Sequence, residues 1–285
     1  MELPVTIDLH MHSTTSDGTD TPEEILMQVK KAGIDLFSLT DHDAIKGCAV
    51  ILDHLKEGDP RFIPGIEFSC RDEKGKYHIL GYAYDISSSA INSIVEQGHA
   101  YRMIKLQKRL AFLKNTFGFA PTLEEINTLL SMDNPGKPHI ADLMIKYGFA
   151  STKREAMHRY INQLQINNEN LKPKEAIEGI LAAGGIPVLA HPSYGDGDQL
   201  ILGDEMEQRL RRLMSFGLQG VEAYYSGFTD KLRQEILSLA EKYKLYVTAG
   251  SDYHGTNKLV ALCDTGLENA SNGVAGLKEF LKRIL

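Results

Sequence analysis

"DLHMHSTTSDGTD", residues 8–20, ends an apolar strand-like run with two histidines two positions apart, His10 and His12. Residues i and i+2 of an extended strand point to the same face about 7 Å apart, so both imidazoles can turn toward one cation. The "SDGT" that follows suits a turn, because Asp and Gly favour turns, and it equally offers a carboxylate ligand in Asp17. The rest of the chain must decide between a metal site and a polar loop.

Apolar runs of this kind recur along the chain and predict buried strands. They are "VTIDLH" (5–10), "DLFSLTDH" (35–42), "RFIPGIEFSC" (61–70), "YHILGYAY" (77–84), "GIPVLAHP" (185–192), "GVEAYY" (220–225) and "LYVTAGSDYH" (245–254). Helical patterns lie between them at 21–33, 173–185, 203–217 and 228–244. The first has Thr21 as N-cap, Pro22 at its first position and Gly33 at its end. The alternation predicts an α/β fold with βα units and a largely parallel sheet.

One long segment breaks this alternation. Between residues 88 and 170 the patterns are helical, at 89–118, 122–130, 138–148 and 152–161, with no strand-like run among them. Residues 87–170 hold ten Lys and Arg against seven Asp and Glu, a balance of +3. Because the whole chain has a net charge of -7, the remaining residues carry -10. We therefore predict two parts: a discontinuous α/β body of residues 1–86 and 171–285, and a basic all-helical insertion of residues 87–170.

Composition limits the class of protein. The chain has 285 residues, 42% apolar and 24% charged, which is ordinary for a soluble globular protein. A net charge of -7 argues against an extended nucleic-acid surface. Apolar runs fall far short of the roughly 18 residues of a membrane span, and the N-terminus carries no Lys or Arg of a secretory signal. Three scattered cysteines suit a reducing compartment, so we expect a cytoplasmic protein. Oligomeric state has no signal in the sequence.

Chemistry-bearing side chains gather at the ends of the predicted strands. They are His10, His12, Asp41, His42, Glu67, His78, His191, Glu222, Asp252 and His254. Barrels and open α/β folds place their active sites at the carboxyl ends of strands, so these residues are expected to converge. A single histidine at a strand end is most often structural. Six of the ten histidines in such places, with acids beside them, favour a site for Zn, Mn or Fe.

Seven motifs in fixed order carry a family resemblance: "DLHMHS…SDG", "TDHD", "GIEFS", "HILGY", "AHP", "GVEAYY" and "GSDYH". This series resembles the polymerase and histidinol phosphatase (PHP) family of metal-dependent phosphoesterases. A single H-x-H would be less specific, because amidohydrolases also begin with one. The resemblance implies a distorted (β/α)7 barrel for residues 1 to about 86 and about 171 to 285, with the helical segment inserted into it.

The resemblance also implies a site of three divalent ions, Mn²⁺, Fe²⁺ or Zn²⁺. Its ligands would be His10, His12, Glu67 and Asp252 at one ion; Glu67 again, with His78 and His191, at the second; and Asp17, His42 and His254 at the third. Asp8 and Asp41 would orient imidazoles by accepting their other N–H. Glu222 belongs to none of these positions, and an orienting or structural role is expected for it.

Charge indicates what such a site accepts. Three divalent ions bring +6 and the carboxylates of Glu67, Asp17 and Asp252 bring -3, which leaves about +3. A phosphate dianion fits that excess, whereas a neutral amide does not need it. A water shared between two ions would have a lowered pKa and would attack phosphorus in line. The acid that protonates the leaving oxygen is not indicated by the sequence.

The insertion adds cations. Arg102, Lys105 and Arg109 lie at i, i+3 and i+7 on one helical face, which by itself is more often a solvated stripe. Lys137 and His139 lie at a predicted helix start, where free N–H groups favour anions. Together they predict a second phosphate-binding pocket, made by Arg102, Arg109, Lys137 and His139.

This pocket resembles the PHP branch that acts on nucleoside 3',5'-bisphosphates and on short RNA 5' ends. Arg102 and Arg109 match its arginine helix, and "KPH" resembles its "RPH" turn, with Lys137 in place of the arginine fork and His99 where another arginine is expected. We expect the substrate to be a small phosphorylated molecule, in first place a nucleoside 3',5'-bisphosphate. Two alternatives stay open: hydrolysis of a cyclic phosphate on a phosphorylated ribose, and a metal-binding regulatory module without turnover.

Overall fold

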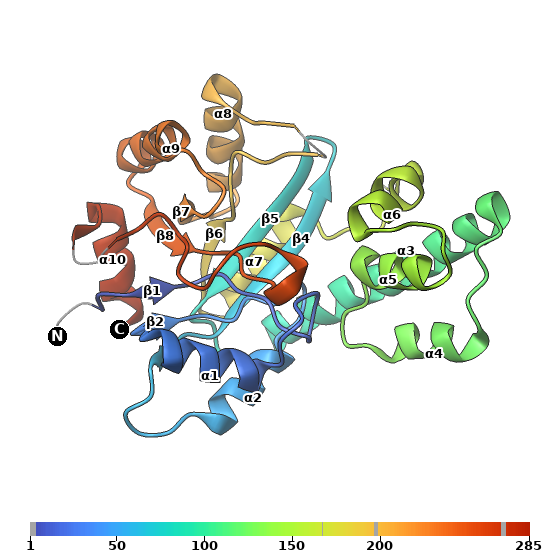
Figure 1. Cartoon of the computed structure of the whole chain (residues 1–285). Coiled ribbons are helices and arrows are strands. Elements are labelled where there is room, and N and C mark those ends of the chain that lie inside the picture. The colour runs from blue at the N-terminus through green and yellow to red at the C-terminus, as the bar shows by residue number, and fades with distance from the viewer. Residues whose placement is uncertain (1–3, 167, 197–198, 269–271) are drawn as a thin grey trace.

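The strands of the protein form two sheets in the computed structural model, which describes residues 4–166, 168–196, 199–268 and 272–285 (Figure 1). β1 (Ile7–Asp8), β2 (Leu36–Phe37) and β3 (Arg61–Phe62) make a parallel three-stranded sheet. The five-stranded sheet contains, in chain order, β4 (Gly65–Asp72), β5 (Gly75–Tyr82), β6 (Ile186–Leu189), β7 (Gly220–Tyr225) and β8 (Tyr246–Gly250). The predicted α/β class is confirmed.

The two sheets are joined beyond the ends of their strands. Isolated parallel bridges link Met11, after β1, to Tyr253, after β8, and His42, after β2, to Glu67 of β4. The strand ends that carry histidines are thereby brought side by side. The regular ladders remain two separate sheets, however, so the single closed (β/α)7 barrel is not found among the described residues.

The expectation of a largely parallel sheet was wrong for the middle of the five-stranded sheet. The run 61–70 divides at Pro64, which has no N–H to donate, into β3 and β4. β4 and β5 then form an antiparallel hairpin, because only a tight turn with Gly75 at a φ of 123° separates them. β5 also pairs antiparallel with β6, whereas β6, β7 and β8 are mutually parallel.

Helices cover the sheets largely as the sequence predicts. α1 (Pro22–Ala32) begins at a capping box made by Thr21 and Glu24 and ends at Gly33, whose φ is 68°. Three more helices follow the predicted patterns: α7 (Pro173–Ala182), α8 (Gly203–Met214) and α9 (Asp230–Tyr243). Two helices were not anticipated, α2 (Lys46–His54) and α10 (Ala275–Ile284).

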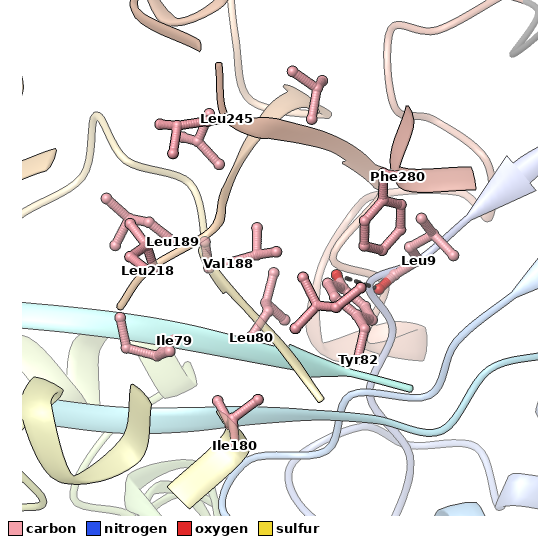
Figure 2. Packing of buried hydrophobic residues seen from close by; sticks show 14 of the residues in the cluster. Leu9, Ile79, Leu80, Tyr82, Ile180, Val188, Leu189, Leu218, Leu245 and Phe280 are labelled. Carbon is pink, nitrogen blue, oxygen red and sulfur yellow. Dashed lines mark hydrogen bonds between the residues drawn. The ribbon is translucent and has the colours of Figure 1, made fainter. Parts of the chain in front are cut away.

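The main core lies between the five-stranded sheet and its covering helices. Figure 2 shows Leu80 and Tyr82 of β5 facing Val188 of β6, with Phe280 of α10 close to Tyr82. The Tyr82 hydroxyl donates a hydrogen bond to the carbonyl of Leu9, with 2.9 Å between the oxygens. This buried bond fixes the segment that carries the paired histidines against the sheet.

Between β5 and α7 the chain is helical. Its elements are α3 (Ser89–Phe117), α4 (Leu123–Ser131), α5 (Lys137–Lys146), α6 (Lys153–Arg159) and the short helix η1 (Ile161–Gln163). They lie beyond the β4–β5 hairpin in Figure 1 and enclose a separate apolar cluster that includes Leu106, Leu113 and Met144. None of the helices in the described part of the chain is long and apolar enough to cross a membrane.

Candidate metal centre and anion pocket

Glu67, on β4, lies at the centre of the predicted ligands and is 1% exposed. Its Oε2 faces ring nitrogens of His10 at 3.3 Å, His12 at 3.2 Å and His42 at 3.0 Å. Its Oε1 faces His78 at 2.7 Å and His191 at 3.1 Å. One carboxylate therefore separates two sets of imidazoles, one on each oxygen.

Three groups of side chains have ligand atoms within 4.8 Å of one another. The first group is His10, His12, Glu67 and Asp252; the second is His42, Glu67 and His78; the third is His12, Asp17, His42 and His254. Strand ends and loops far apart in sequence thus bring all nine predicted ligands together. The grouping differs from the expected one in detail, because His42 belongs to two groups and His191 contacts Glu67 without joining a group.

The donor chemistry of these groups fits divalent metal ions. Nε2 of His10, Nε2 of His12 and Nδ1 of His42 are buried without a hydrogen-bond partner, although they face carboxylate oxygens. A buried polar atom normally has a partner, and a cation between an imidazole lone pair and a carboxylate supplies one.

The surrounding imidazoles keep the Glu67 carboxylate ionised. Burial opposes its ionisation, but His78, His42 and His10 outweigh that effect and hold its pKa well below the usual range. The same balance, with His10 and His12 as the main partners, lowers the pKa of Asp252. Both carboxylates are therefore ionised at neutral pH.

Glu222 on β7 orients two of the predicted ligands. Its Oε1 accepts from Nδ1 of His10 at 2.8 Å, and its Oε2 accepts from the backbone N–H of His191 at 2.9 Å. The first contact leaves Nε2 of His10 to face the first group. His191 has a φ of 26°, an unfavourable value for a residue with a side chain, so the second contact holds a strained backbone. The strand-end pattern included Glu222, but nothing in the sequence indicated these partners.

The expectation that Asp8 and Asp41 accept from imidazoles was wrong as a direct contact. Asp8 accepts from the backbone N–H and hydroxyl of Ser251, at 2.9 and 2.6 Å, and from the N–H of Cys263 at 2.8 Å. Backbone N–H groups at the strand ends are buried and need acceptors, and Asp8 lies level with them.

Asp41 likewise accepts hydrogen bonds from buried donors near another strand end. It accepts from the N–H and hydroxyl of Ser13 and from the hydroxyl of Ser16, each at 2.7 Å. The Ser16 hydroxyl also lies 3.5 Å from Nδ1 of His12. Asp41 therefore reaches an imidazole only through Ser16.

The β4–β5 hairpin extends from the metal groups as a row of polar and basic side chains. Alternate residues of a strand share a face, so Ser69 and Arg71 lie on the same face as Glu67. On β5, His78 is paired with Ser69 and Lys76 with Arg71. The sequence analysis missed Arg71 and Lys76, although the two-residue period of the hairpin could have revealed them.

Helix α3 places its basic face beside this hairpin. Arg102 donates from Nε to Asp43 at 2.7 Å and from Nη2 to the Ser69 hydroxyl at 3.0 Å. One and two turns further along α3 lie Lys105, whose Nζ donates to Asn170 at 3.0 Å, and Arg109. Arg102 thus links α3 to the hairpin, and Lys105 and Arg109 lie further along the helix.

The region between the hairpin and the insertion carries excess positive charge. Six cations interact there, namely Arg71, Lys76, Arg102, Lys105, Arg109 and Lys137, while two carboxylates, Asp43 and Asp196, neutralise Arg102 and Arg71. With every Lys and Arg protonated, the formal excess is six minus two, or +4. Within the described part of the chain, Arg109 Nε is buried without a hydrogen-bond partner, and the Lys76 ammonium donates no hydrogen bond to a side chain, although Glu67 and Asp196 act on it electrostatically. We call these six cations the basic pocket.

Burial and the crowding of cations lower the pKa of two lysines in the basic pocket. Burial, then Arg102, lowers the pKa of Lys105 to about 7. Burial, then Arg109, lowers the pKa of Lys137 to about 8, and its Nζ contacts only the neutral amide of Asn162, at 2.5 Å. A bound anion would relieve this repulsion.

His139, the fourth predicted phosphate-binding residue, lies in the first turn of α5. Its Nδ1 accepts from the N–H of Gly136 at 3.0 Å, and burial lowers its pKa. A neutral ring in this orientation presents Nε2–H as a donor. Asp17 and Arg102 are among the charged groups that act on its ring.

The strand ends of this α/β fold gather six histidines, Glu67 and three further carboxylates, Asp17, Glu222 and Asp252, an arrangement typical of a metal-dependent hydrolase. The PHP domain family model matches residues 8–243, and the chain belongs to this family. The resemblance found in the sequence motifs is therefore confirmed.

Known proteins similar to this chain agree with that class. A phosphoribosyl 1,2-cyclic phosphate 1,2-diphosphodiesterase of Eggerthella lenta is 29% identical over 87% of this chain and 94% of its own length. A 3',5'-nucleoside bisphosphate phosphatase of Chromobacterium violaceum is 27% identical over 87% of each chain. A solved Bifidobacterium adolescentis structure, described as a metal-dependent phosphoesterase, superposes with a TM-score of 0.82 and 27% identity over 100% of this chain and 98% of that one. All three are described as hydrolases of phosphoric ester bonds.

Proposed function

We propose that this PHP phosphoesterase removes the 3'-phosphate of a nucleoside 3',5'-bisphosphate or acts on the 5' end of a short RNA, using three divalent ions. The observation that carries the proposal is the basic pocket beside the metal groups, with its formal excess of +4 and with Arg109 Nε buried without a hydrogen-bond partner among the described residues. Two anion sites next to each other suit a substrate with two phosphates.

The residues would have different roles according to their positions. The nine ligands would hold the ions, which when bound supply a nucleophile at neutral pH and neutralise charge on the phosphate under attack. Arg109 and Lys137 would bind the phosphate that is not cleaved and so fix the substrate relative to the strand ends. His139, whose ring interacts electrostatically with both Asp17 and Arg102, would donate Nε2–H to an oxygen of the substrate.

A cyclic phosphate on a phosphorylated ribose is the second candidate. It is favoured by the 29% identity to the Eggerthella lenta diphosphodiesterase over nearly the full length of that protein. Such a substrate also carries one phosphate to be cleaved and one to be held. The comparison that separates the candidates is phosphate release from adenosine 3',5'-bisphosphate, from a ribose cyclic phosphate carrying a 5-phosphate, and from histidinol phosphate.

We expect Arg109→Met to raise KM for adenosine 3',5'-bisphosphate about tenfold or more, because a charged hydrogen bond contributes about 1.5–3 kcal/mol. KM for p-nitrophenyl phosphate, which has one phosphate, should change little. Steady-state kinetics with both substrates measure the difference.

Arg154→Met is the matched control, since it removes one exposed positive charge from the same insertion. An equal rise of KM for both substrates in Arg109→Met would show that Arg109 does not bind the second phosphate. No metal-dependent turnover on any substrate would instead support the regulatory-module alternative.

A further inference from the structure

The two oxygens of Asp252 have different surroundings. Oδ1 faces ring nitrogens of His12 at 3.2 Å, His254 at 3.4 Å and His10 at 3.5 Å. It is therefore the oxygen that belongs to the first group. Oδ2 points away from these imidazoles, toward side chains that no ligand prediction included.

Two donors hold Oδ2. The Tyr225 hydroxyl donates to it at 2.9 Å, and Nζ of Lys258 lies 2.5 Å from it. Nζ of Lys258 also donates to the Tyr225 hydroxyl at 2.9 Å, so the three groups form a closed triangle. The phenol donates its one proton to the carboxylate and accepts from the ammonium, which satisfies the geometry of all three.

The triangle is built on rigid supports. Tyr225 ends β7, is 5% exposed and packs against the rings of His191, Tyr194 and Phe228 at centroid distances of 5.5, 5.8 and 5.0 Å. Asp252 has a φ of 57°, in the left-handed region that side-chain-bearing residues rarely adopt. Strained residues of this kind persist where surrounding contacts determine them, as the triangle does here.

We propose that Tyr225 and Lys258 form a clamp that makes Asp252 a one-oxygen ligand. A free carboxylate can bind a cation through one oxygen or both, and the second oxygen would occupy a further coordination position. Because the clamp occupies Oδ2, Asp252 would give only Oδ1 to an ion in the first group and would leave that position to substrate or water. Tyr225 and Lys258 are thus positioning residues. The inference rests on the metal centre and does not depend on which phosphate ester is the substrate.

Tyr225→Phe tests the clamp without changing charge. Loss of a hydrogen bond that orients a metal ligand typically costs 10- to 100-fold in affinity, so we expect apparent Mn²⁺ affinity, measured by chelator competition, to fall about tenfold. In the Co²⁺-loaded protein the visible absorption should weaken, because a freed Oδ2 raises the coordination number. Tyr194→Phe is the matched control, since that hydroxyl donates to the carbonyl of Gly227 and not to a ligand.

Lys258→Met provides a second variant on an exposed loop, in case the buried tyrosine change impairs folding. It should weaken the Co²⁺ absorption as Tyr225→Phe does, and Lys258→Arg should restore it by returning a charged donor. Thermal unfolding of each metal-free variant checks that it is folded at the temperature of the metal-binding assay. Unchanged Mn²⁺ affinity and Co²⁺ absorption in both Tyr225→Phe and Lys258→Met would overturn the clamp, as would equal effects in Tyr194→Phe. None of these measurements needs a substrate, so a failed phosphatase assay leaves the test intact.

Discussion

Glu67 and Glu222 are both buried carboxylates, yet their partners give them different roles. Glu67 faces five imidazoles with its two oxygens, whereas Glu222 accepts from one imidazole and one backbone N–H. Each oxygen of Glu222 accepts from one of these two donors. A residue in that position must be a carboxylate, because an amide would turn an N–H toward another N–H.

Glu222→Gln is predicted to weaken metal binding. Gln retains one acceptor oxygen, so either His10 Nδ1 or the backbone N–H of His191 would face an amide N–H. We expect apparent Mn²⁺ affinity to fall by about 10- to 100-fold, and kcat with it when metal is limiting. Bound metal after dialysis, measured by atomic emission, checks the change. Glu279→Gln on α10 is the control for the substitution type, and equal metal content in both variants would contradict the prediction.

At the scale of elements, α3 connects the body of the molecule to the insertion. Ile94, on its N-terminal half, packs near Gly179 of α7, while Leu106 and Leu113 join the separate cluster of the insertion. This 29-residue helix is packed near both of its ends. Its middle turns can therefore present Arg102, Lys105 and Arg109 to the β4–β5 hairpin in a fixed position.

This arrangement predicts a pH dependence. Burial and Arg102 depress the pKa of Lys105 to about 7, so the ammonium is charged below pH 7 and neutral above it. We expect kcat/KM for the doubly phosphorylated substrate to fall between pH 6.5 and about 8 as that charge is lost. Lys105→Arg should flatten this part of the profile, because a guanidinium stays charged. Identical profiles for the two proteins would exclude Lys105 as the titrating group.

At the scale of the whole molecule, the metal groups join parts of the chain that are otherwise distant. Their ligands come from the ends of β1 and β8, from the loops after β1, β2 and β6, and from both strands of the hairpin. A bound ion would therefore oppose separation of the two sheets as well as support chemistry. Metal binding and stability of the body are expected to be linked.

Metal removal is accordingly predicted to lower Tm. Binding at 100 times Kd contributes about 2.7 kcal/mol, and for a chain of this size about 2–4 °C is expected per kcal/mol. Differential scanning calorimetry with Mn²⁺ and then with excess EDTA should show a decrease of about 5 °C or more. Asp252→Asn, which removes a ligand of the first group, should reduce that difference. A Tm that is independent of EDTA would show that the ions do not join the two sheets.

Local signals were predictable from the sequence where neighbouring residues decide the outcome. Thr21, Pro22 and Gly33 bound α1 as expected, because capping and left-handed turns depend on a few adjacent residues. The ordered motifs likewise indicated the family, and through that resemblance the nine candidate ligands, which stay a prediction. Pro64 was visible too, but its effect on the direction of β4 depended on a partner strand that the sequence pattern did not specify.

The α/β class, the cations of α3 and α5 and the side chains that gather at the strand ends could be predicted from the sequence alone. Which atoms of those side chains face one another depends on how the strands pack together. His10 contacts Glu222, from which it is separated by 212 positions in the sequence, and Asp252 contacts Tyr225, 27 positions away. These contacts arise because strands from distant parts of the chain end at one place, and the orientation of a carboxylate there is set by donors that no local pattern encodes.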